Sequence, residues 1–189
     1  MNTIIWDTRL KVITGMIITA ALFRLAPHPY NFTPIGAMAL FGGCYVSNKR
    51  LAFIIPLGAM LMSDILLQLL HSTGLQAFAL TSGFHPGMIW VYGSFALITC
   101  LGFLLRGREQ RQTIMVASLV GSILFFIITN FGQWATGYYG YTGDALTKSF
   151  IMGIPFFSGT LMGDLFYNLA LFGSFALARW KFPVLAKQS

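Results

Sequence analysis

The chain has very few charged residues, and acidic residues are the scarcest of them. Of its 189 residues, 12 are lysine or arginine and only 5 are aspartate or glutamate, so charged residues make up 9%. Hydrophobic residues make up 56%, and the mean hydropathy is +0.72. A soluble domain of this length needs far more polar surface to face water. The composition therefore excludes an ordinary soluble domain and predicts a protein of the lipid bilayer.

Cysteine is also scarce, and familiar catalytic motifs are absent. Cys44 and Cys100 show no CxxC or metal-type spacing, and we interpret both as small apolar residues. The three histidines, His28, His71 and His85, lack the i, i+4 spacing of a helical metal site. The sequence contains no GxSxG, HExxH or P-loop motif. We therefore expect no metal, no cofactor and no nucleotide hydrolysis by this chain itself.

What the sequence has in abundance is long apolar runs. A bilayer core requires about 17 to 25 mostly apolar residues in each spanning helix. The second run begins with Pro34 and is short, which predicts a tilted or broken helix. No polar linker divides the chain, so residues 1–189 are predicted to form one domain. The sequence predicts an all-α membrane protein, a six-transmembrane-helix bundle, with helices over about residues 10–25, 32–46, 51–70, 87–105, 113–134 and 153–178.

The positive charges are distributed unevenly along the chain. Ten of the 12 lysines and arginines fall at the two termini and in the second and fourth connections, which lie on one side of a six-span bundle. Arg24 and Lys148 fall on the other side. The positive-inside rule therefore predicts that both termini are cytoplasmic. This placement explains the net charge of +7 without a nucleic-acid partner.

Two of the acidic residues, Asp64 and Asp164, lie inside apolar runs. A carboxylate at the centre of a bilayer costs roughly 2.5 kcal/mol or more, so such residues usually face the interior of a bundle and serve a function. Arg24, at the outer end of the first helix, is the nearby cation. Either Arg24 reaches Asp64, or one or both aspartates are protonated hydrogen-bond donors.

Other polar residues accompany the aspartates. Asn168 follows Asp164 at i+4, on the same face of its helix. We predict that a group of polar and aromatic residues from several helices lines one cavity open to the outside. The alternative for each amide is a hydrogen bond between helices that holds the bundle together. The predicted substrate contacts are Asn31, Asp64, Asn130, Trp134, Asp164 and Asn168.

The outer connections are longer than the cytoplasmic ones, running through Ala26–Asn31, His71–Pro86 and Ala135–Met152. Loops longer than about 12 residues in compact proteins are often functional. The last of these is rich in tyrosine and glycine and is predicted to form a lid, with Tyr138, Tyr139 and Tyr141 against the bound molecule. An interfacial aromatic belt is the alternative interpretation of the tyrosines.

Three stretches carry a resemblance to known families. They are PHPYNFTPIGAMALFGGCYVSNKRLAFIIPLGAMLMSDILLQ at Pro27–Gln68, LFFIITNFGQWATG, and PFFSGTLMGDLFYNLALFG. Together they resemble a family of uncharacterised bacterial inner-membrane proteins. The pattern of Asn-x-x-Pro, a small and apolar second helix, a basic connection and a third helix ending in Ser-Asp is also similar to the S-components of energy-coupling-factor vitamin transporters. The resemblance implies a multi-pass protein of the bacterial cytoplasmic membrane with an S-component-like fold.

The resulting functional hypothesis is a substrate-binding or uptake protein for a small, vitamin-like micronutrient. Its expected partners are the lipid bilayer and the small-molecule ligand. The resemblance to S-components adds a separate transmembrane energising subunit with ATPases. Two other classes stay open: an intramembrane enzyme that uses Asp64 and Asp164 as acid and base, although no nucleophile accompanies them, and a structural or assembly subunit of a membrane complex.

Overall fold

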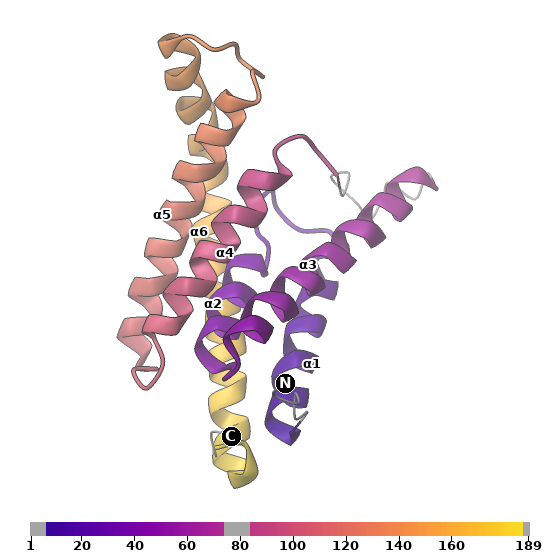
Figure 1. Cartoon of the computed structure of the whole chain (residues 1–189), viewed down its shortest axis with the longest axis vertical. Coiled ribbons are helices and arrows are strands. Elements are labelled where there is room, and N and C mark those ends of the chain that lie inside the picture. Colours follow the sequence, from indigo (N-terminus) through magenta and orange to yellow (C-terminus); the bar gives the residue numbers. More distant parts are fainter. Residues whose placement is uncertain (1–6, 74–83, 187–189) are drawn as a thin grey trace.

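The computed structural model describes residues 7–73 and 84–186. Within these residues the chain forms six α-helices and two short 3-10 helices and contains no strand, which confirms the all-α prediction (Figure 1). The elements are α1 (Thr8–Leu22), η1 (Phe23–Leu25), α2 (Ile35–Tyr45), α3 (Lys49–Ser72), α4 (Met88–Leu104), α5 (Arg111–Ala135), α6 (Gly143–Lys181) and η2 (Pro183–Leu185).

Three of the described helices, α3, α5 and α6, are long and apolar enough to cross a membrane. The remaining three are shorter. In particular, α2 has 11 residues, which at about 1.5 Å per residue gives it roughly half the thickness of a bilayer core. It begins directly after Pro34, in agreement with the short second helix that the sequence predicts. Most of the predicted connection His71–Pro86 falls on residues 74–83, which lie outside the described residues.

The helix α2 forms the centre of the molecule, and all of its residues are buried. It packs against α3, α4 and α6. Glycines make this close packing possible, because a Cβ added at Gly43 would collide with the backbone of α4 at Thr99, and one added at Gly42 would collide with the ring of Pro56 on α3. The apolar core therefore surrounds a short helix whose glycines let the neighbouring helices pack closely against it.

Positive side chains gather where α2 ends. Arg106 donates from Nη2 to the carbonyl of Val46 at 2.7 Å and from Nε to that of Gly43 at 3.0 Å. A cation at the C-terminus of a helix pairs its last carbonyls and interacts favourably with the helix dipole. Arg9 and Arg179 lie over the rings of Tyr45 and Phe175 at the same level. We call this region the basic end; both chain termini lie toward it in Figure 1.

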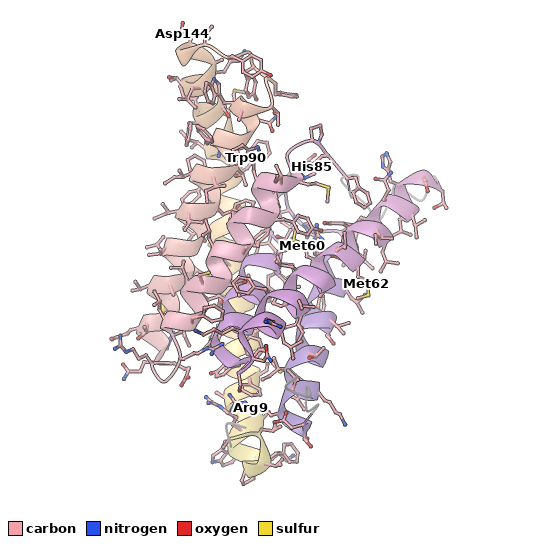
Figure 2. All side chains as sticks on the ribbon, viewed as in Figure 1. Arg9, Met60, Met62, His85, Trp90 and Asp144 are labelled. Atoms are coloured by element: carbon pink, nitrogen blue, oxygen red, sulfur yellow. The ribbon has the colours of Figure 1, made fainter. Side chains whose placement is uncertain are left out.

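The opposite end is formed by the turn between α5 and α6, with Asp144 at its tip (Figure 2). Here the structure differs from the expectation of a loop over Ala135–Met152, because α6 begins at Gly143. The hydroxyl of Thr142 accepts a hydrogen bond from the amide of Ala145, and Asp144 lies in the first turn, where the helix dipole favours an acid. The other predicted helix boundaries agree with the observed ones to within three residues.

The first turns of α6 are attached firmly to α5. The hydroxyl of Ser149 donates to the carbonyl of Asn130 at 2.6 Å, and the indole nitrogen of Trp134 donates to the carbonyl of Thr142 at 3.1 Å. The charged residues that make this segment resemble a loop, Asp144 and Lys148, lie on its exposed face. The segment is therefore an amphipathic helical extension, and only residues 136–142 connect the two helices.

Candidate functional site

A cavity of about 220 Å³ lies beside the N-terminus of α2. We call it the central cavity. Met60 on α3 and His85 just before α4, both labelled in Figure 2, belong to its lining. Its polar lining residues are Arg24, His28, Tyr30, Asn31, Thr33, Asp64, His85, Tyr92, Thr160 and Asp164. Because these residues come from η1, from the segment before α2 and from α3, α4 and α6, the cavity depends on the whole fold.

An ion pair forms one wall of the central cavity. The Nη1 atom of Arg24 lies 2.6 Å from Oδ1 of Asp64, and the hydroxyl of Tyr92 donates to Oδ2 of Asp64 at 2.6 Å. The side chain of Asp64 is 3% exposed and that of Arg24 is 12% exposed. This contact confirms that Arg24 reaches Asp64. Both oxygens of the carboxylate are therefore occupied by protein groups.

The arginine in this pair retains hydrogen-bonding capacity. Its contacts with Asp64, with the hydroxyl of Ser63 and with the carbonyl of Met60 all use Nη1. Among the described residues, Nε and Nη2 donate to no acceptor. A guanidinium carries five N–H donors in a fixed planar geometry. Arg24 can therefore stay paired with Asp64 and also donate to a molecule in the cavity.

The second buried carboxylate lies on the other side of the cavity. Asp164 is 5% exposed, and its Oδ2 accepts a hydrogen bond from the hydroxyl of Ser122 on α5 at 2.6 Å. The carboxylate packs directly against Gly36 in the first turn of α2, where an added Cβ would collide with it. The unpaired N–H groups at a helix N-terminus favour negative charge. Asp164 therefore lies against the first turn of α2, the end of a helix that favours an acid.

A second cavity, of about 390 Å³, adjoins the first toward the α5–α6 turn. We call it the tyrosine cavity, because Tyr138 and Tyr139 line it together with Asn130. The two cavities share five lining residues, which shows that they are neighbours. The shared residues are Asn31, His85, Val91, Phe125 and Thr160.

The structure brings together some of the predicted site residues and separates others. Asn31, Asp64 and Asp164 line the central cavity, whereas Asn130, Tyr138 and Tyr139 line the tyrosine cavity. Three predicted residues line neither of these two cavities. Trp134 bonds to the α5–α6 turn, the Tyr141 ring lies against Gly137, and Asn168 is buried between α5 and α6.

Several residues that line the central cavity or bind its carboxylates were not expected from the sequence. Tyr92 and Ser122 bind the two carboxylates, but an isolated tyrosine or serine in an apolar helix gives no signal that separates it from an interfacial or packing residue. Gly36 has a usable signal, since a glycine in the first turn of a helix allows close approach by another group. His85 also lies at the site, next to Pro86 in the sequence.

The fold and the site define an all-helical protein with helices suited to a membrane and with buried carboxylates around a polar cavity. The chain belongs to a family of unknown function, DUF6580, whose model matches residues 5–185. This match confirms the resemblance to an uncharacterised family. No curated protein and no solved structure matches the chain. The comparisons do not show the looser similarity to S-components.

Proposed function

We propose that this protein is a membrane-embedded binding or uptake protein for a small, vitamin-like micronutrient that is neutral or cationic. The observation that carries the proposal is the central cavity, in which Arg24 offers unused donors on one wall and Asp164 presents a carboxylate on another. Ligand sites typically combine apolar walls with a few polar groups that fix orientation. The tyrosine cavity supplies the entrance.

The proposed topology is six membrane spans with both termini in the cytoplasm, in the bacterial cytoplasmic membrane. It is supported by the cluster of Arg9, Arg106 and Arg179 at the basic end, which the positive-inside rule assigns to the cytoplasm. In this orientation the central and tyrosine cavities lie toward the outside. The short helix α2 is long enough to cross only part of the bilayer, and in this topology residues 26–34 complete the second span.

The lining favours a ligand with a flat ring. Phe95 and Phe125 stack on each other with ring centroids 5.0 Å apart, and both border the central cavity beside Tyr92. Aromatic faces bind flat heterocycles through apolar and stacking contacts. A volume of about 220 Å³ fits a small heterocycle, and any longer substituent would extend into the tyrosine cavity. Asp164 would accept a hydrogen bond from an N–H group of the ligand.

An intramembrane enzyme is supported less well. Acid–base chemistry at Asp64 requires a carboxylate that can exchange a proton with a substrate. Both oxygens of Asp64 are already bound to Arg24 and Tyr92. A structural subunit would use the same helices for packing only, and the lined cavity argues against that role. An energising transmembrane subunit with ATPases stays part of the proposal as the power source for uptake.

The test is purification of the protein from native membranes, followed by mass spectrometry of the small molecules released on denaturation. We expect one species in near-stoichiometric amount in the parent and at least about tenfold less in Asp164→Asn, which keeps the side-chain volume but loses the charge. Asp144→Asn, at the exposed tip of α6, is the matched control and should retain the molecule. Equal retention by both variants, or an empty parent, would contradict the proposal.

A further inference from the structure

Four buried polar side chains form a ladder between α5 and α6. On the first rung, the hydroxyl of Ser122 donates to Asp164 at 2.6 Å, and on the second, Nδ2 of Asn168 donates to the hydroxyl of Ser118 at 3.0 Å. The two helices run antiparallel, so one turn along α5 matches one turn along α6. None of the four side chains is more than 5% exposed. The ladder is therefore a continuous polar feature inside an apolar interface.

This ladder joins two cavities at different depths. Asp164 lines the central cavity, whereas Ser118 and Asn168 line a third cavity of about 400 Å³ that extends along α5 and α6 toward the basic end. Tyr45 and Arg179 border the third cavity at that end. Hydrogen bonds between two packed helices do not generally border a cavity at each end. The position of this ladder therefore favours a role beyond helix packing.

The ladder leaves a buried acceptor unfilled. The Oδ1 atom of Asn168 is buried and accepts no hydrogen bond from the described residues. Ser122 lies within hydrogen-bond distance of both Asp164 and the carbonyl of Ser118, but its single proton can serve only one of them. In the described part of the chain, no lysine, arginine or histidine nitrogen lies within 4.0 Å of the Asp164 carboxylate. An unfilled buried acceptor costs about 1–3 kcal/mol, and a cation that binds here would fill it while also pairing with the carboxylate.

We propose that Asp164, Ser122, Ser118 and Asn168 form a sodium-binding site. One carboxylate among neutral oxygens balances the charge of a monovalent ion, whereas a divalent ion usually takes several carboxylates. A proton requires only the carboxylate and would leave Oδ1 of Asn168 unused. The N-terminus of α2 faces the Gly36 side of the carboxylate, and the ion approaches from the opposite, Ser122 side.

The hydrogen bonds of the ladder are compatible with a bound ion. The hydroxyl of Ser122 keeps its proton directed at Asp164 while its lone pairs face the ion. The carbonyl of Ser118 has a second lone pair beyond its helical hydrogen bond. The amide oxygen of Asn168 supplies the remaining protein ligand. This site goes beyond the proposed function and does not depend on it, because the ion can be measured without any small molecule.

The experiment measures binding of radioactive ²²Na⁺ to the purified protein by scintillation proximity, together with thermal unfolding in NaCl, KCl and choline chloride at equal ionic strength. We expect saturable ²²Na⁺ binding and a melting temperature that rises with NaCl only. Ser122→Ala and Asn168→Leu each remove one oxygen ligand and should raise the half-saturating sodium concentration by roughly tenfold or more. Ser94→Ala is the matched control, because Ser94 is equally buried but bonds only to its own helix.

Each contrary result overturns the proposal. Equal stabilisation by the three salts would mean that only ionic strength acts. Unchanged sodium affinity in both ladder variants would show that any sodium site lies elsewhere. A melting temperature that responds to pH but not to sodium would assign the ladder to a proton. Because the small-molecule experiment above uses no sodium readout, either proposal can fail while the other holds.

Discussion

Removing one member of the Arg24–Asp64 pair should destabilise the protein far more than removing both. In Asp64→Leu, the guanidinium stays in a site where its side chain is 12% exposed. Among the residues that the structure describes, it keeps only Ser63 and the Met60 carbonyl as partners. Breaking a buried pair in this way typically costs about 3–5 kcal/mol. Because Arg24 lines the central cavity and its side chain is 12% exposed, we expect the lower part of this range, about 3 kcal/mol.

Tyr92 adds to that cost. Its hydroxyl loses the Asp64 acceptor, which contributes about 1 kcal/mol more and brings Asp64→Leu to about 4 kcal/mol. In the double variant Arg24→Met/Asp64→Leu, both charges are gone and apolar groups of similar volume replace them. Replacing a buried ion pair by apolar groups often leaves stability unchanged or raises it. The main remaining loss is then the hydrogen bond of the Tyr92 hydroxyl, about 1 kcal/mol. The double variant is thus expected to be about 3 kcal/mol more stable than Asp64→Leu.

The assay is unfolding of the purified variants in mixed micelles by titration with a denaturing detergent, monitored by tryptophan fluorescence. A double-mutant cycle with Arg24→Met then gives the coupling energy, which should be at least about 3 kcal/mol in magnitude. The double variant should fold but release no small molecule on denaturation, since the donors of Arg24 are lost. Additive single and double effects would refute the argument that the pair is buried and mutually compensating.

Three further outcomes are expected. Gly36→Ala should lower both stability and small-molecule retention, because its methyl group collides with Asp164; retention equal to the parent's would show that the contact is loose. In a Cys44→Ala/Cys100→Ala background, Tyr141→Cys should react with an impermeant thiol reagent in intact cells and Gln112→Cys only after lysis; the reverse would invert the topology. Amide hydrogen exchange across residues 136–142 should slow when the small molecule is bound, and unchanged exchange there would contradict a lid.

The helices could be predicted from the sequence because hydrocarbon demands uninterrupted apolar runs, and runs of that kind have few alternative interpretations. The same requirement for apolar runs explains the main difference between the predicted and the observed helices, which is that α6 begins at Gly143 and not near residue 153. It excluded the segment with Asp144 and Lys148 from the last helix, although a capped amphipathic helix can extend beyond the apolar layer. A helix cap at Thr142 and an acid two residues later were visible in the sequence as a start signal.

The candidate site was predictable where burial carries a large energetic cost. Asp64 and Asp164 were evident for that reason, and the lack of other cations nearby led to Arg24. The residues that bind these carboxylates could not be predicted, because burying a hydroxyl group costs far less than burying a charge. Tyr92 and Ser122 are separated by 28 and 42 residues from the carboxylates that they bind, and only the packing of α4 and α6 against their neighbours sets those pairings.

The position of the cavity follows from where α2 begins. Prolines at positions 27, 29 and 34 prevent the helix from continuing toward the α5–α6 turn, because each lacks an N–H and restricts the residue before it. Asn31 adopts a left-handed backbone with φ of 58°, a conformation that asparagine tolerates better than most residues. A full-length second helix would place its side chains in the space that the central cavity now occupies. The short helix instead leaves that space open, and its N-terminus faces Asp164 across Gly36.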